Sequence, residues 1–139
     1  ITLEYTTNCT LAPKPEWIES IKHFKDVIVI CSIDGVGKVN SKIRRGSDWS
    51  KVSRTFDFFK SLDIRLRVNT VVMTENIFHL AELSKWISDN NLDNWSCNVL
   101  TWPSELSITT LPNIDKQQLY TVIEQCNITD KQFILDQLQ

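Results

Sequence analysis

Short strand-like segments alternate with helical segments along this chain of 139 residues. The strand-like segments are aliphatic or alternate between apolar and polar residues. They comprise residues 1–6, 27–33, 64–73 and 95–100. The stretches between them place apolar side chains at helical spacing, as Val52, Phe56 and Phe59 do. Because strands joined by helices form parallel sheets with right-handed crossovers, this order predicts an α/β fold built from successive strand–helix units.

Helix signals lie between and after these strands. Pro13 and Pro15 mark the turn into a first helix, and Ser47 or Asp48 is expected to cap a second. Residues 35–47 are predicted to form a long polar loop between the second strand and that cap. Further helices are predicted over residues 76–90, 119–126 and 129–138.

The two faces of the predicted strands differ in polarity. Leu3 and Tyr5 on the first strand, and Leu66, Val68, Thr70 and Val72 on the third, form an apolar set that should face the helices. The opposite face carries polar residues: Glu4, Thr6, Asn8, Arg67, Asn69 and Asn98. Neither a sheet covered by helices on both sides nor a barrel filled with aliphatic layers would accept this face. The pattern predicts a curved sheet around a wet or ligand-filled lumen, with Glu4 and Arg67 paired inside it.

The most informative segment reads ICSIDGVGK, from Ile30 to Lys38. Its Ser32 and Asp34 point the same way at the carboxyl end of a strand, where a hydroxyl and a carboxylate can hold ribose hydroxyls or an ammonium group. Alternatively, Asp34 shapes a turn with Gly35. Both interpretations stay open at this point.

Two further side chains are candidates for the same edge of the sheet. Arg44 lies just before a helix start and could bind a carboxylate bidentately, although paired arginines such as Arg44 and Arg45 more often lie in solvent. Asn69 would be enclosed in the lumen, where its amide needs a partner that a ligand could provide.

Composition excludes several classes of function. The formal charge of −2 gives no sign of a nucleic-acid or anionic-membrane surface, and no apolar run approaches the ~20 residues of a membrane span. The four cysteines, Cys9, Cys31, Cys97 and Cys126, are too scattered for a zinc or iron–sulfur motif, so no metal site is predicted within the chain. Cys31 and Cys97 are expected to be small buried hydrophobes, and a reduced, cytoplasmic setting fits the chain best.

Three segments resemble radical S-adenosylmethionine enzymes. TTNCT, at residues 6–10, is similar to the Thr-Asn-Gly-Thr that ends the third barrel strand of this superfamily. VIVICSIDGVGKVNSKIRRGSDW, at residues 27–49, resembles the fourth strand with its Ser-Ile/Leu-Asp-Gly and a later Arg-x-Gly. RVNTVVMTENI, at residues 67–77, is similar to the fifth strand and the start of its helix. The three segments occur in the correct order, and the resemblance is strongest to the branch with a SPASM or shortened twitch extension.

The resemblance implies a fold and a parent activity. Residues 1–110 would be strands 3–6 of a TIM-like, open (β/α)₆ barrel, and residues 111–139 a helical C-terminal extension. The parent enzyme would cleave S-adenosylmethionine reductively at a [4Fe–4S] cluster and abstract hydrogen from a substrate, in several relatives a peptide or protein. Ser32 and Asp34 would contact the methionyl or ribose part of the cofactor, Arg44 its carboxylate, and Asn8 and Asn69 would line the same cavity.

The chain departs from the family pattern in three places. The C-x₃-C-x₂-C loop that holds the cluster is absent, and so is the Gly-Gly-Glu segment that binds the amino group of the cofactor. Cys9 stands where glycine is usual. The chain begins with Ile1 rather than Met, so we expect it to be a fragment; because nothing in it can deliver an electron to the sulfonium, we expect that fragment to be inactive alone. The alternatives are a non-catalytic α/β binding or interaction module and, more weakly, a barrel enzyme without a cofactor that uses Asp34 and Glu4 as acid–base groups.

Overall fold

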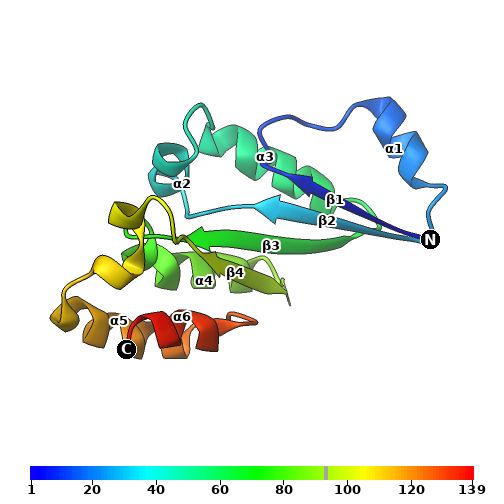
Figure 1. Cartoon of the computed structure of the whole chain (residues 1–139). Coiled ribbons are helices and arrows are strands. Elements are labelled where there is room, and N and C mark those ends of the chain that lie inside the picture. The colour runs from blue at the N-terminus through cyan, green and yellow to red at the C-terminus, as the bar shows by residue number, and fades with distance from the viewer. Residues whose placement is uncertain (93) are drawn as a thin grey trace.

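The computed structural model describes residues 1–92 and 94–139 and contains one sheet of four parallel strands (Figure 1). The strands are β1 (Thr2–Thr7), β2 (Asp26–Ser32), β3 (Arg65–Val72) and β4 (Trp95–Val99). Their order in the sheet is their order in the chain, so every crossover moves one strand further in the same direction. This is the arrangement of a barrel wall, because a doubly wound sheet reverses its strand order at a switch point. The predicted α/β class and partial parallel barrel are confirmed.

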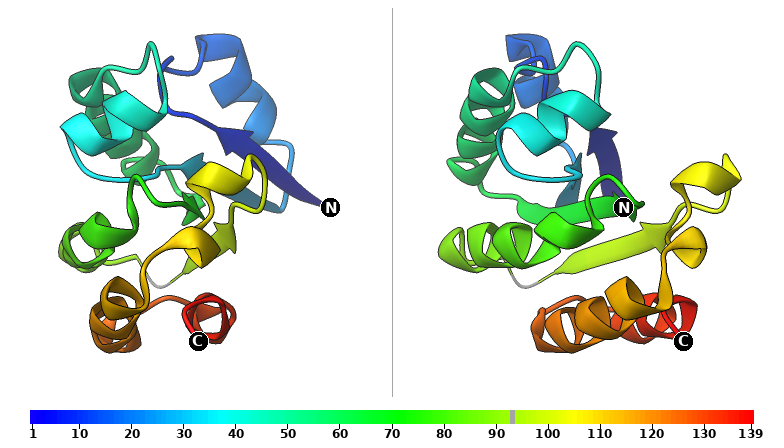
Figure 2. Two further views of the ribbon diagram at one scale, coloured as in Figure 1. Left: turned by 60° about the vertical axis from the view of Figure 1, so that its left-hand side comes forward. Right: turned by 90° about the vertical axis from the view of Figure 1, so that its left-hand side faces the viewer.

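In the described part of the chain, six α-helices connect or follow the strands: α1 (Pro15–Ile21), α2 (Lys38–Ile43), α3 (Trp49–Lys60), α4 (Leu80–Asp89), α5 (Asn113–Gln125) and α6 (Lys131–Gln137). Short 3₁₀ turns occur at Ile77–His79, Ser104–Leu106 and Ile108–Thr110. Helices α3 and α4 cover one face of the sheet, whereas the segment that follows β4 extends away from them (Figure 2). Among the helices that the structure describes, none is both long enough and apolar enough to cross a membrane.

The core lies between the sheet and these two helices. Val29, Cys31, Val68 and Val72 on the central strands are fully buried, as the alternation in the sequence predicts. The helices contribute buried side chains to the same cluster: Val52, Phe56, Phe59, Leu80, Leu83 and Ile87. Cys97 is also buried, so Cys31 and Cys97 are the core residues that the sequence predicts.

A polar connection in the core joins β4 and β3 to Ile33, the residue that follows β2. The Trp95 indole donates from Nε1 to Thr70 Oγ1 over 2.9 Å, and the Thr70 hydroxyl donates to the Ile33 carbonyl over 2.6 Å. Thr70 belongs to the apolar set of the sequence pattern, and this pair of bonds allows its hydroxyl to be fully buried there.

Replacing Trp95 with phenylalanine should lower the free energy of unfolding by about 1.5 kcal/mol, because the indole hydrogen bond and part of the buried volume are lost. Trp102→Phe is the matched control, since the Trp102 side chain is 79% exposed and should change stability by less than about 0.5 kcal/mol. Urea denaturation measures both. Equal losses in the two variants would contradict this account of the core.

The opposite face of the sheet is polar, in agreement with the prediction. Arg67 on β3 reaches Glu4 on β1, with 3.8 Å between Nη1 and Oε1. Their register partners on β2 are Ile30 and Ile28, so the ion pair spans the intervening strand. The predicted Glu4–Arg67 pair is therefore present, although both side chains remain partly exposed and the pair adds little to stability.

The two edges of the sheet are treated differently. At the outer edge of β4, the Thr129 amide donates to the Trp95 carbonyl over 2.9 Å, and buried residues of α6, Ile134 and Leu135, pack beside the strand. At the other edge, β1 pairs with β2 as its one strand partner within the described sheet, and most of its side chains are exposed. Helix α1 approaches β1 through the Tyr5–Trp17 contact, with ring centroids 5.2 Å apart.

Two helices differ from their predicted positions. Helix α2 lies inside the predicted polar loop of residues 35–47. It packs so closely against the preceding loop that a Cβ on Gly35 would lie 2.5 Å from Val39 Cγ1. The residue that it buries is polar, Asn40, so the sequence contains no apolar repeat that would predict this helix. Helix α5 begins at Asn113 rather than residue 119. The prediction missed its first turns because they expose Ile114 and bury no apolar side chain.

Candidate functional site

The carboxyl ends of all four strands meet at one edge of the sheet, as they must when the strands are parallel. This edge faces the viewer in the right-hand panel of Figure 2, where α2 and the segment after β4 frame it. Ligands of α/β sheets bind outside the carboxyl ends of the strands. Ser32 and Asn69 lie on β2 and β3, Asn8 and Asp34 follow β1 and β2, and Arg44 follows α2.

Asp34 is the centre of a hydrogen-bonded network just beyond β2. Its side chain is almost fully buried, and Oδ1 accepts from the Val71 amide over 2.8 Å. Its own amide donates to Asn40 Oδ1 over 2.9 Å, and its carbonyl accepts from Asn76 Nδ2 over 2.9 Å. Asp34 therefore connects the loop after β2 to the end of β3.

Arg44 lies at the end of α2, beside the second oxygen of this carboxylate. Its Nε is 2.8 Å from Asp34 Oδ2, but the N–H is not aligned for a hydrogen bond. The side chain is 26% exposed, and the structure shows no hydrogen bond from its two terminal nitrogens to any described residue. Asp34 thus holds the inner side of the guanidinium while the outer nitrogens are available to a ligand.

Ser32 and Asn69 are register partners on the polar face of β2 and β3. Asn69 Oδ1 accepts from Ser96 Oγ over 3.2 Å and from Asn98 Nδ2 over 3.3 Å. Within the described part of the chain, neither Asn69 Nδ2 nor the Ser32 hydroxyl has a hydrogen-bond partner. Both groups are only half-buried, so this row can present an amide and a hydroxyl to a ligand in the lumen.

Asn8 directly follows Thr7, the register partner of Cys31, but no hydrogen bond joins its side chain to the other four predicted residues among those that the structure describes. Its Oδ1 accepts from the Thr10 amide over 3.0 Å and from Thr10 Oγ1 over 2.7 Å, and the side chain is exposed. The structure thus yields two close pairs, Asp34 with Arg44 and Ser32 with Asn69, and a separate turn that carries Asn8.

Two buried asparagines that the sequence did not single out hold this edge together. Asn76 Nδ2 donates to the carbonyls of Asp34 and Val71, and its Oδ1 accepts from the Met73 amide over 2.9 Å. Asn40 has no exposed surface and leaves Nδ2 without a partner among the described residues. Both follow strand ends in polar stretches, which is the one signal that could have identified them.

The cysteines do not fit an iron–sulfur cluster. All four are buried and distributed through the core, and no group of three or more His, Cys, Asp or Glu side chains in residues 1–92 and 94–139 could hold a metal ion. Burial also raises the pKa of the Cys97 and Cys126 thiols, which disfavours the thiolate form that binds metals. No step of a cluster reaction can be assigned to these residues.

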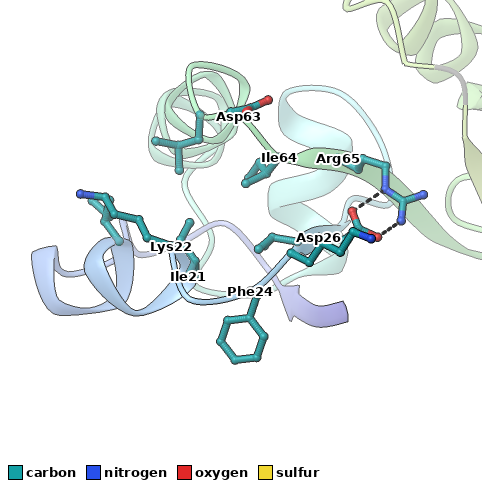
Figure 3. A pocket seen from close by; sticks show the side chains of 11 residues that line it. Ile21, Lys22, Phe24, Asp26, Asp63, Ile64 and Arg65 are labelled. Atoms are coloured by element: carbon teal, nitrogen blue, oxygen red, sulfur yellow. Dashed lines mark hydrogen bonds and ion pairs between the residues drawn. The ribbon is translucent and has the colours of Figure 1, made fainter. Parts of the chain in front are cut away.

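A surface pocket of about 570 Å³ lies at the other end of the sheet, near the amino ends of β2 and β3 (Figure 3). Two of its charged groups pair with each other, since Arg65 donates from Nε and Nη2 to the two carboxylate oxygens of Asp26. The Arg65 guanidinium therefore holds the pKa of Asp26 below its usual range. Ile21, Phe24 and Ile64 add apolar surface to the pocket, which contains none of the residues predicted for the site.

Comparison with known proteins gives no family model and no curated protein that matches this chain. Solved structures do match. The protein anSMEcpe with bound AdoMet superposes with a TM-score of 0.65 and 17% identity, over 87% of this chain and 35% of that one. SuiB of Streptococcus suis bound to S-adenosylmethionine gives 0.63 and 17%, over 87% of this chain and 27% of SuiB. SuiB bound to its precursor peptide SuiA gives 0.61 and 19%, over 90% and 30%.

The chain therefore spans about a third of the length of the solved structures that it matches. At these identities the likeness shows the fold. Both proteins are radical S-adenosylmethionine enzymes that act on peptides. The chain has the fold of part of the barrel of radical S-adenosylmethionine enzymes, as the three segments of its sequence predict.

Proposed function

We propose that this chain is part of a longer radical S-adenosylmethionine enzyme and forms one side of its cofactor cavity. One observation carries the proposal: each of the three sequence segments that resemble the superfamily contains the carboxyl end of a strand, and these ends lie at one edge of a parallel sheet. The fold of that sheet is shared with proteins whose structures contain AdoMet. The activity of the whole enzyme is part of the proposal, because this chain spans only about a third of those structures.

Arg44 is the residue with the most specific role in this proposal. Its free terminal nitrogens form a fork that matches a carboxylate, and S-adenosylmethionine carries one on its methionyl part. Asp34 is buried and already has two partners for its carboxylate, so its contribution is to hold Arg44 in place. A guanidinium whose inner side is paired loses less conformational freedom when the ligand arrives.

Ser32, Asn69 and Asn8 complete the cavity side contributed by this chain. The Ser32 hydroxyl and the Asn69 amide lie in one row of the sheet and can donate to ribose hydroxyls. Asn8 lines the rim, on the exposed turn after β1.

Another part of the enzyme would hold the [4Fe–4S] cluster. S-adenosylmethionine reduced by that cluster would supply the means to abstract hydrogen from the substrate. We place a peptide or protein in the substrate role, because anSMEcpe and SuiB have both been captured with peptides. The residues of this chain bind and orient the cofactor and exclude water from one side of it.

The experiment compares Arg44→Ala with Arg45→Ala in the protein encoded by the complete gene. Arg45 is the adjacent, exposed arginine, so it is a matched control for charge. Arg44→Ala removes the charge-assisted hydrogen bonds to the methionyl carboxylate, which contribute about 1.5–3 kcal/mol, so S-adenosylmethionine binding should weaken by roughly 10- to 100-fold. Arg45→Ala should bind S-adenosylmethionine as the wild type does. Isothermal titration calorimetry measures both.

A second ligand makes this test specific. 5′-Methylthioadenosine keeps the adenosine but lacks the methionyl carboxylate, so its affinity should be the same in the wild type and in Arg44→Ala. An equal loss for both ligands would show that Arg44 supports the fold rather than the carboxylate, and no loss for S-adenosylmethionine would remove Arg44 from the cavity.

A further inference from the structure

The turn after β1 contains an unusual cysteine. Cys9 has φ 59°, in the left-handed region that favours glycine, and its amide donates to Thr7 Oγ1 over 3.0 Å. Despite this local strain, its side chain has no exposed surface and belongs to the core cluster under the sheet. The turn therefore directs a thiol inward from the edge strand.

A second buried cysteine, Cys31, lies on the strand next to this turn. Cys31 on β2 is the register partner of Thr7, two residues before Cys9, and it is also fully buried on the helix-facing side. The neighbouring Cys9 thiol and burial together raise the pKa of the Cys31 thiol. Both cysteines are unoxidised in the structure.

We propose that Cys9 and Cys31 are a redox-modifiable pair that closes into an intramolecular disulfide and fixes the turn after β1 to β2. Cys9 follows β1 by two residues, Cys31 lies on the paired strand β2, and both are fully buried in the same core cluster, which supports this pairing over any other among the four cysteines. The inference does not depend on the proposed function.

The oxidant is a small disulfide. One cysteine thiolate attacks it, the S–S bond of the reagent breaks, and one reagent thiol leaves with a proton. The second cysteine then attacks the resulting mixed disulfide, and a second reagent thiol leaves with the second proton. The protein thiols lose two electrons in total, and the reagent disulfide gains them.

Access to the buried pair comes from the edge of the sheet. Strand β1 has one strand partner and mostly exposed side chains, so its end can open locally without global unfolding. Because the pKa of Cys31 is raised, few thiolates form while the pair is closed, and opening of the turn limits the reaction.

The test treats the reduced chain with 2-hydroxyethyl disulfide under native conditions, alkylates the remaining thiols and maps the tryptic peptides. Lysines or arginines separate the four cysteines, so each falls in a peptide of its own. We expect a mass loss of about 2 Da confined to the linked peptides of Cys9 and Cys31, with Cys97 and Cys126 alkylated. The same treatment in denaturant should give mixed pairings.

Cys9→Gly is the control variant, because glycine removes the thiol and suits the positive φ, so the fold should be retained. It should form no disulfide at Cys31, whereas Cys126→Ser should form the Cys9–Cys31 link as the wild type does. In the wild type, the link should raise Tm by roughly 5–10 °C. Mixed pairings in the native protein, a Cys97–Cys126 product, or no link at all would overturn the proposal.

Discussion

Replacing Asp34 with alanine is expected to lower the free energy of unfolding by about 3 kcal/mol, measured by urea denaturation. The substitution leaves the Val71 amide without its acceptor and leaves Arg44 without its partner carboxylate. Loss of the acceptor of the Val71 amide should be the larger part of the effect, because this partly buried donor loses its hydrogen bond, whereas the Arg44 side chain is 26% exposed and can turn toward water.

Two variants separate these contributions. Asp34→Asn keeps an oxygen for the Val71 amide and removes the charge beside Arg44, so its loss should be about 1 kcal/mol. Asp48→Ala removes an exposed helix cap, in which Oδ1 accepts from the Ser50 amide over 2.9 Å, and should also lose about 1 kcal/mol. A loss in Asp34→Ala no larger than in Asp48→Ala would show that the network around Asp34 does not hold the strand ends.

Replacing Asn76 with alanine should lower the free energy of unfolding by a similar amount, about 3 kcal/mol, because it breaks three hydrogen bonds at one buried site. The exposed Asn127 provides the control, and Asn127→Ala should change stability by less than about 0.5 kcal/mol. The same urea titration measures both variants.

Asn76→Asp gives a sharper result than the alanine variant. It keeps the acceptor for the Met73 amide, but it turns a carboxylate oxygen toward the carbonyls of Asp34 and Val71. The aspartate should therefore be at least as destabilising as alanine at neutral pH and partly recover at acid pH, where a protonated carboxyl donates again. A stability of Asn76→Asp that did not respond to pH would argue against the observed orientation of the amide.

The fold was predictable because its signals are local. Alternation along β1 and β3 assigns one face to the helices, and the apolar spacing of α3 identifies the layer that covers it. Helix α2 was not predicted because it is short and its buried residue is polar: Asn40 accepts a hydrogen bond from the Asp34 amide. A periodicity argument detects buried apolar surface and does not detect a helix held by one amide.

The candidate site was only half predictable. The sequence placed Ser32, Asp34, Arg44 and Asn69 at one edge of the sheet, but it left open whether Asp34 faces a ligand or shapes a turn. The structure gives Asp34 partners at Val71 and Asn76, which are far from it in the chain. Contacts of that kind depend on the register between strands, which no local pattern specifies.

The central claim is that this edge of the sheet belongs to a radical S-adenosylmethionine enzyme. The most direct test is anaerobic purification of the protein encoded by the complete gene, reconstitution with iron and sulfide, reduction in the presence of S-adenosylmethionine, and quantification of 5′-deoxyadenosine. We predict that 5′-deoxyadenosine forms and that Arg44→Ala reduces it at low cofactor concentration while Arg45→Ala does not. A complete gene without a C-x₃-C-x₂-C motif, whose product neither binds S-adenosylmethionine nor forms 5′-deoxyadenosine, would contradict the account and favour a non-catalytic binding module.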